Sequence, residues 1–497
     1  MKNLFYTALF SAVVLNASNI DLKSTNLYNA TAFIPSQCYT KTVDENNMKH
    51  NPCYACHTKA IEPNYFSDED LQEEYSFPEY ATKNRWTNLF KDRTDEIDKI
   101  SDEEITKYIG QDNYKDKKSN IILSNKLKKL PNEWDFNNNG KWDGYIPDCN
   151  FNFDSNGFDR DNNNNITGWR AFGYYPFLGT FWPTNGSTDD VMIRLPKVFW
   201  LDMDGKIDLE IYNQNLGIVE KLVKQRTKQL PLSYVGLAST KKLKLVSGLY
   251  PLGTEFLHSV RYLDTTNNSI GLSKRMKELR YAKKLYWANY SAHKDLSDEE
   301  VKENDDFPDR YSIYLGDIEQ GLSNKRGWTY QGFIEDKQGD LRPQSYEETL
   351  FCMGCHASIG AITDSTFSFP RKFEDSLKNG WYDWSQKSLK GISDKNNEYV
   401  KYLKNNNHAN EHRTNMEVYE KFFKNGKLNP KEIDKIKEDI SYLLFPSKER
   451  AISLNKAYKV IVDEQSFIYG RDTHIKPIKN VHKQLEENQP TKLEIVE

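Results

Sequence analysis

The sequence predicts an α+β fold that is predominantly helical, with long loops and a few β-hairpins. Three observations lead to this prediction. Helical periodicity and capping boxes recur from residue 67 onward, two stretches alternate like hairpin strands, and residues 131–188 combine Asn, Asp, Gly and aromatics without helical periodicity. Aromatic residues make up 13% of the 497 positions, and disordered chains lack them, so we expect a folded protein with many polar loops.

The N-terminus has the pattern of an export signal. Lys2 precedes an apolar run from Leu4 to Leu15, and Ala17 is a small residue suited to a cleavage point. The run is too short to span a bilayer and no later run is long enough, so we predict a cleaved signal at residues 1–17 and a periplasmic mature chain without a transmembrane span. The alternative is an uncleaved N-terminal helix or anchor. No Cys follows the predicted cleavage point, so the sequence does not indicate a lipid anchor there.

The first half of the chain is expected to contain helices and then a hairpin. The stretches SDED at 67–70 and SDEE at 101–104 have the form of capping boxes, in which a Ser and an acidic residue three positions later satisfy each other's backbone N–H groups. The segment VFWL at 198–201, the turn DMDG and the alternating KIDLEIY predict a hairpin. A helix is predicted after it, with one apolar face formed by Leu216, Val219, Leu222 and Val223.

The second half is predicted to be mostly helical. A strong helix is expected from about Ser273 to Tyr290, because Met276, Leu279 and Trp287 fit helical spacing. Further predicted elements are a short helix capped by SDEE at 297–300, a hairpin at 328–344, a helix near 415–425, and a helix carrying Ile433, Ile436, Ile440 and Leu443. The last segment has no clear pattern, and no internal repeat is evident.

Four of the six cysteines form two identical patterns, CYACH at 53–57 and CMGCH at 352–356. Cys-x-x-Cys-His is the attachment pattern of c-type haem, in which two thiols bond the porphyrin and the adjacent His ligates the iron. A thioredoxin-like thiol pair would need a βαβ context, which surrounds neither site. A zinc site of four thiolates is disfavoured in an oxidising compartment. The repeated pattern and the export signal therefore favour haem attachment.

At these two pentads the sequence resembles c-type cytochromes. The resemblance implies cytochrome c-like haem sites, in which the cysteines hold two haems covalently and each adjacent histidine is the proximal ligand of the iron. The residues are Cys53, Cys56 and His57 for the first haem, and Cys352, Cys355 and His356 for the second. The resemblance covers little beyond the pentads and identifies no particular subfamily.

The ligand on the other face of each iron decides the chemistry. An iron held by protein on both faces transfers electrons, whereas an open face binds peroxide or oxygen. His258 is a candidate distal ligand, because a histidine in the apolar segment TEFLHSVRYL is unusual. The alternative for His258 is a hydrogen-bonded core histidine.

These patterns divide the chain into five parts. They are a signal peptide (1–17), an N-terminal haem region (18–130), a region of Asn/Asp/aromatic-rich loops with a hairpin and a helix (131–260), a helical region with the second haem site (261–445) and a C-terminal extension (446–497).

Cys38 and Cys149 lie outside the two pentads. Because spare thiols in an exported protein commonly pair, we predict a disulfide between them. The alternative is two unpaired buried thiols.

Two Asn/Asp-rich loops resemble calcium-binding loops. Oxygen-bearing side chains alternate along each loop, as calcium requires, but the glutamate that usually closes such a loop is replaced by Ile146 in the first loop and by Arg170 in the second. The alternative is turns whose side chains bond their own backbone. The candidate calcium ligands are Asp135, Asn137, Asn139 and Asp143 in the first loop, and Asp159, Asp161, Asn163 and Asn165 in the second.

The function predicted from these observations is electron transfer between periplasmic donor and acceptor proteins by an exported diheme c-type cytochrome. The alternative is a diheme peroxidase or related oxidoreductase with one open haem, so the sequence does not decide whether the protein is an enzyme. A net charge of −4 and the absence of a Lys/Arg stripe argue against a nucleic-acid partner.

Overall fold

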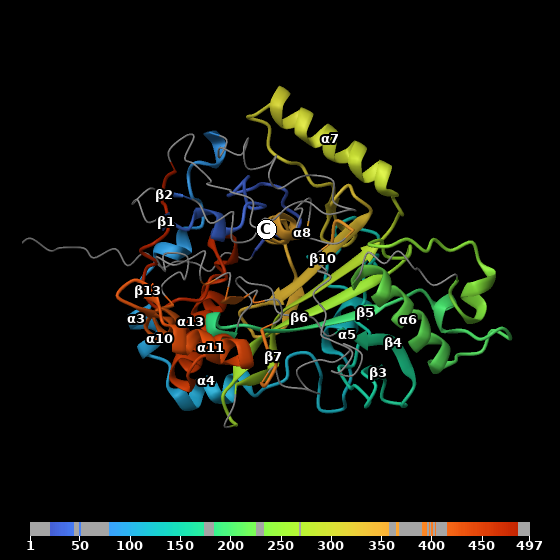
Figure 1. The fold of residues 1–497 in the computed structure, drawn as a ribbon, viewed down its shortest axis with the longest axis horizontal. Coiled ribbons are helices and arrows are strands. Elements are labelled where there is room, and N and C mark those ends of the chain that lie inside the picture. The colour runs from blue at the N-terminus through green and yellow to red at the C-terminus, as the bar shows by residue number, and fades with distance from the viewer. Residues whose placement is uncertain are drawn as a thin grey trace, which may run out of the picture.

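The computed structural model describes residues 20–43, 49–50, 79–172, 183–224, 233–267, 270–356, 364–366, 390–394, 397, 399–400, 403 and 415–485. At the centre of this part of the chain is a nine-stranded antiparallel sheet, ordered β3-β4-β5-β6-β7-β10-β9-β8 with β11 paired to β10 (Figure 1). The strands are β3 (Phe158–Arg160), β4 (Ile166–Ala171), β5 (Thr188–Arg194), β6 (Glu255–Asp264), β7 (Gly271–Lys284), β8 (Gly316–Asp317), β9 (Gly321–Ser323), β10 (Trp328–Glu335) and β11 (Leu341–Pro343).

The prediction of a predominantly helical fold is therefore wrong, and β7 shows why. The segment expected to be a helix from Ser273 to Tyr290 is largely this strand, the longest of the sheet. Val260 pairs with Glu278 and Arg261 pairs with Met276, so Lys277 is an extra residue in a bulge. Because a bulge shifts the alternation of a strand, Met276 and Leu279 contribute to the same core cluster although they are three positions apart. This spacing imitates the face of a helix.

The two faces of the sheet have separate apolar cores. Along β6, Phe256 belongs to one cluster and the next residue, Leu257, to another, as expected for strand side chains that point to opposite faces. Helix α8 covers the face of Phe256, because its Leu350 and Met353 join that cluster. The face of Leu257 is covered by the loops around Trp142 and by α5.

Helices surround the sheet rather than forming the core (Figure 1). Helices α3, α4, α10, α11 and α13 gather near one end of the sheet, α6 lies near the other end, and α7 projects at the top of the view. Their bounds are α3 (Thr94–Asp98), α4 (Asp102–Ile109), α5 (Ile122–Lys128), α6 (Leu209–Lys224), α7 (Tyr290–Asp306), α8 (Tyr346–His356), α10 (Met416–Phe422), α11 (Pro430–Glu438), α12 (Ser441–Leu444) and α13 (Lys448–Glu464). None of these helices has the length and hydropathy needed to cross a bilayer.

Two of the three predicted capping boxes fall within the described part. Ser101 begins α4 as expected, since its hydroxyl accepts a hydrogen bond from the Glu104 N–H. The box at 297–300 is wrong because α7 already begins at Tyr290, and Ser297 is a buried mid-helix residue that donates to the His293 carbonyl. The box at 67–70 lies outside the described residues.

The Ser101 cap gives a first testable prediction. Replacing Ser101 with Ala leaves the Glu104 N–H without its acceptor, so the free energy of unfolding should fall by about 1 kcal/mol. Urea denaturation followed by circular dichroism measures this change. Lys107→Ala, an exposed position on the same helix, is the control and should change stability by less than about 0.5 kcal/mol.

The hairpin predictions have different outcomes. The hairpin at 328–344 is confirmed as β10 and β11. The hairpin at 198–212 is only partly right. Leu201 and Ile207 bridge across the DMDG turn, but the second strand is replaced by α6, whose first turn is held by the Asp208 carboxylate accepting from the Glu210 and Ile211 N–H groups.

The C-terminal region is more ordered than its sequence indicates. Helix α10 occurs where a helix was predicted, and a short hairpin of β12 (Phe423–Lys424) and β13 (Lys427–Leu428) follows it, turning at Gly426. The single helix predicted to carry Ile433 to Leu443 is broken at Asp439 into α11 and α12. The segment after residue 446 showed no clear pattern, yet it forms the 17-residue helix α13. A further short hairpin, β1 (Thr42–Val43) and β2 (Lys49–His50), lies near the N-terminus. The predicted boundary between residues 260 and 261 falls inside β6.

Candidate functional site

The structure places the two cysteine pentads unequally. Cys53, Cys56 and His57 lie outside the described residues. Cys352 lies in α8 and is buried, with 7% of its surface exposed. Cys355 and His356 end the same helix, and their side chains lie outside the described part.

His258 is a buried core histidine with a carboxylate partner. Its Nε2 lies 2.8 Å from Oδ2 of Asp189, which comes from the neighbouring strand β5. Asp189 is itself 4% exposed, so the pair is shielded from water. The alternative interpretation of His258, a hydrogen-bonded core residue, therefore describes its environment.

His258 and Cys352 line the same small cavity, on the face of the sheet that α8 covers. We call it the Cys352 cavity; its volume is about 40 Å³. Apolar walls come from Val191, Phe256 and Ala282. The polar residues that line it on this face of the sheet are His258, Arg280, Tyr330, Thr349, Cys352 and Thr366.

Arg280 brings a permanent positive charge to this cavity. Burial alone would lower the pKa of Arg280, but the neighbouring Cys352 thiol and the Glu278 carboxylate raise it above its ordinary value. The guanidinium therefore stays charged at any physiological pH. Arg280 and Cys352 both line this cavity.

A buried ionic network fixes Arg280. The Glu278 carboxylate lies 2.8 Å from the Arg280 guanidinium and 3.0 Å from that of Arg471. Burial would raise the pKa of Glu278, but these two cations lower it to about 2. Arg471 also donates to the backbone carbonyl of Glu348 in α8. The network thus ties β7 to α8, the two elements that supply Arg280 and Cys352.

The hydroxyl groups of Tyr330 and Thr366 complete the walls in fixed orientations. The Tyr330 hydroxyl donates to Oγ1 of Thr366 at 2.9 Å. Such preset dipoles around a cation can orient a small polar molecule next to the thiol.

The predicted Cys38–Cys149 disulfide is wrong. Cys38 packs against the core cluster on one face of the sheet, and Cys149 lies in the cluster on the other face. The sheet separates the two sulfurs, so they cannot bond. Burial raises the pKa of the Cys149 thiol well above its ordinary value, and nearby Asp159 adds to the shift.

The Asn/Asp-rich loops are turns that bond their own backbone. In the first loop, Asp135 accepts from the N–H groups of Asn139 and Gly140, and the side-chain amides of Asn137 and Asn139 donate to Asp143. Donors that point at the carboxylate occupy the positions that a cation would need. The calcium prediction at this loop is therefore wrong.

The second loop has the same character. Asp161 accepts from the N–H groups of Asn163 and Asn165, and the Asp159 carboxylate accepts from Asn150 N–H and the Thr167 hydroxyl. In the part of the chain that the structure describes, no group of three or more His, Cys, Asp or Glu side chains is placed to hold a metal ion. The calcium prediction is wrong here as well.

Sequence reasoning missed Arg280, Glu278 and Asp189. Each is a charged residue in the interior of a strand. A strand that alternates apolar and charged residues usually exposes its charged face to water, so the sequence did not show that both faces of this sheet are buried. Only the apolar neighbours of His258 signalled a buried polar group, and they pointed to one member of the site.

The comparisons with known proteins identify a family. A model described as a lipoprotein family matches residues 22–429. An uncharacterised lipoprotein of Aquifex aeolicus is 33% identical over 523 aligned residues, which cover 92% of this chain and 88% of the relative. No solved structure matches significantly.

These matches overturn the predicted function. They are to lipoproteins and not to cytochromes, and the described residues hold no cluster of metal ligands. The predictions of a diheme electron-transfer cytochrome, of its peroxidase alternative and of two haem cofactors are wrong. Lipoproteins are exported, which agrees with the predicted export signal. The chain belongs to this lipoprotein family.

Proposed function

We propose that this exported protein binds a small anion in the Cys352 cavity, next to the Cys352 thiol. The observation that carries the proposal is the position of Arg280, a buried and permanently charged guanidinium on the cavity wall. A guanidinium presents several N–H donors in one plane, which suits the oxygens of carboxylates and other oxyanions.

The size of the cavity limits the ligand. Its volume is about 40 Å³, and in the same measure a cavity needs about 10 to 15 Å³ to hold one water molecule. A small inorganic anion or a small carboxylate therefore suits this cavity better than a sugar or a nucleotide. The Thr366 and Tyr330 hydroxyls and the His258–Asp189 pair are the other polar groups that such an anion meets.

The thiol provides a direct test. Iodoacetate carries a negative charge and iodoacetamide does not, so a cationic wall should favour iodoacetate at Cys352. We expect the ratio of the two alkylation rates at Cys352 to fall about tenfold in Arg280→Gln and to be kept in Arg280→Lys. Peptide mapping by mass spectrometry reads each cysteine separately, and Cys149, buried beside Asp159, is an internal control that should react with neither reagent.

Two controls make the outcome decisive. Arg310→Gln removes an exposed guanidinium that does not line the Cys352 cavity, so it should leave the ratio of the two alkylation rates unchanged. Formate or nitrate added to the wild-type protein should slow alkylation of Cys352 by both reagents, a result that does not depend on the folding of any variant. Equal rates for the two reagents, with no protection by anions, would contradict the proposal.

The cellular location belongs to the same proposal. We infer that the mature chain works in the periplasm, where the predicted signal would deliver it. Fractionation of expressing cells with and without detergent separates a dissolved periplasmic protein from one held to the membrane by a lipid.

A further inference from the structure

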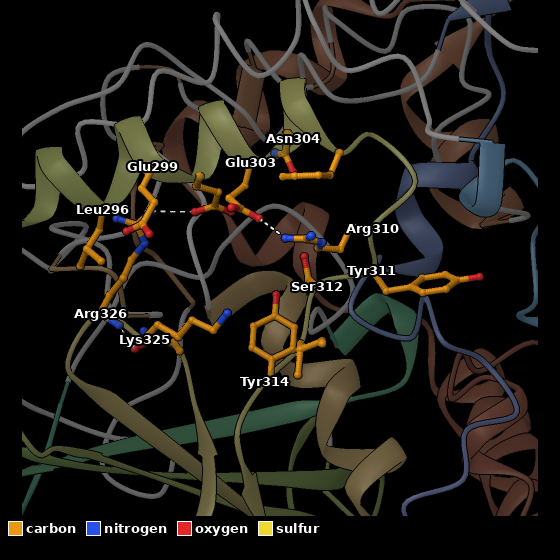
Figure 2. Close-up of a pocket in the computed structure, with 14 residues that line it drawn as sticks. Leu296, Glu299, Glu303, Asn304, Arg310, Tyr311, Ser312, Tyr314, Lys325 and Arg326 are labelled. Carbon is orange, nitrogen blue, oxygen red and sulfur yellow. Dashed lines mark hydrogen bonds and ion pairs between the residues drawn. The ribbon is translucent and has the colours of Figure 1, made fainter.

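A second pocket lies at the surface, between α7 and the segment that follows it (Figure 2). Its volume is about 380 Å³, which is within the range of small-molecule sites and about ten times that of the Cys352 cavity. We call it the α7 groove. One wall is α7, and the other consists of residues 310–314 and 324–326.

The two walls carry opposite charges. Glu299, Glu300 and Glu303 line the α7 side, whereas Arg310, Lys325 and Arg326 line the facing side. Four of these charges form two ion pairs across the groove. Glu303 lies 2.5 Å from Arg310, and Glu300 lies 2.7 Å from Arg326. Within the described residues, neither Glu299 nor Lys325 takes part in an ion pair, so each wall keeps one charge for a ligand.

Hydrogen bonds hold the backbone of Lys325 in position. It has a positive φ of 59°, and its N–H donates to the Ser323 hydroxyl while its carbonyl accepts from the Tyr286 hydroxyl. In Figure 2 its side chain runs into the groove toward Tyr314. Lys325 is exposed, so its ammonium group is accessible to a ligand that enters the groove from solvent.

Apart from Asn304, Ser312 and Asn324, the rest of the groove is lined by apolar and aromatic side chains, and it is partly open to water. Leu296 and Tyr314 line it, and the side chains of Phe307 and Ile313 are 46% and 59% exposed. Exposed apolar surface next to two single charges favours a ligand with an apolar body and two charged ends.

We propose that the α7 groove binds a zwitterionic ligand with an apolar side chain, of the class of an apolar amino acid or short peptide. The ligand carboxylate pairs with Lys325 and its ammonium group pairs with Glu299. The apolar side chain lies against Phe307, Ile313 and Tyr314. This site is separate from the Cys352 cavity and does not depend on anion binding there.

Isothermal titration calorimetry with leucyl-leucine tests the assignment. We expect binding to weaken about tenfold for N-acetyl-leucyl-leucine, which lacks the ammonium group, and about tenfold for the C-terminal amide, which lacks the carboxylate. Glu299→Gln should weaken binding of leucyl-leucine but not of the acetylated peptide. Lys325→Met should weaken binding of leucyl-leucine but not of the amide.

Matched controls separate the groove from general charge effects. Asp295→Asn, an exposed acid of α7 that does not line the groove, and Lys337→Met, an exposed base elsewhere, should leave the affinity unchanged. Equal binding of leucyl-leucine and its acetylated form would show an anion site instead and overturn the proposal. If none of the three peptides binds, the proposal is overturned as well.

Discussion

Replacing Glu278 with Gln should lower the free energy of unfolding by about 3 to 5 kcal/mol. Glu278 is 3% exposed and pairs with two guanidiniums, those of Arg280 and Arg471. The glutamine keeps the shape but removes the negative charge, so both buried cations lose the carboxylate that they share. Removing one partner of a buried ion pair is among the most destabilising single changes.

The dependence of the unfolding free energy on pH tests the same prediction independently. The pKa of Glu278 is about 2 in the folded protein and 4.5 ordinarily, so its ionised form stabilises the fold by about 3 kcal/mol above pH 4.5. This contribution is lost as the pH falls toward 2, because the unfolded chain takes up the proton first. The difference in unfolding free energy between wild type and Glu278→Gln should therefore shrink between pH 5 and pH 2.

The matched control is an ion pair at the surface. Glu303→Gln removes the partner of Arg310, and the two side chains are 49% and 54% exposed. Exposed pairs contribute about 1 kcal/mol or less, so this variant should stay close to wild type in urea denaturation. If Glu278→Gln costs no more than Glu303→Gln, the buried network does not stabilise the fold.

Local signals in the sequence predicted local structure well. The Ser101 cap, the β10–β11 hairpin and the apolar face of α6 depend on residues within a few positions of each other. The sheet depends on pairings between distant segments, and these leave little trace in a single sequence. In β7 the bulge at Lys277 even produced helical spacing, which is why the longest strand was mistaken for a helix.

The site shows the same division. His258 and Cys352 attracted attention in the sequence, and the structure brings both to one cavity. Their partners could not be found in that way, because Asp189 lies 69 positions before His258 and Arg471 lies 193 positions after Glu278. The cysteine pattern predicted a cytochrome, which the match to a lipoprotein family does not support, although it drew attention to Cys352, which lines the cavity.

Replacing Lys277 with Met should remove a pH dependence of stability. Lys277 is the extra residue of the β7 bulge, is 1% exposed and has its Nζ 4.0 Å from the centre of the Tyr458 ring. Burial lowers the pKa of Lys277 from 10.5 to about 7, against the opposing effect of Glu278 and Glu335. Between these two values the unfolded chain binds a proton that the folded protein does not, so wild-type stability rises with pH.

The measurement is the difference between the two proteins, not either curve alone. From pH 7 to pH 9 the unfolding free energy of the wild type should gain about 2 kcal/mol relative to Lys277→Met. The variant also loses the bonds from Nζ to Gly186 and Ser187, which shifts its curve without changing the slope. Titration of Cys149 above pH 8 affects both proteins equally and cancels.

Lys337→Met shows what an exposed lysine does. Its stability should follow the wild-type curve at every pH, because the ammonium group of Lys337 is in contact with water before and after folding. Parallel curves for wild type and Lys277→Met would mean that Lys277 stays protonated in the folded protein. The cation would then be held by the Tyr262 and Tyr458 rings and by the carboxylates around it, and the bulge would be a site of buried positive charge rather than of a neutral amine.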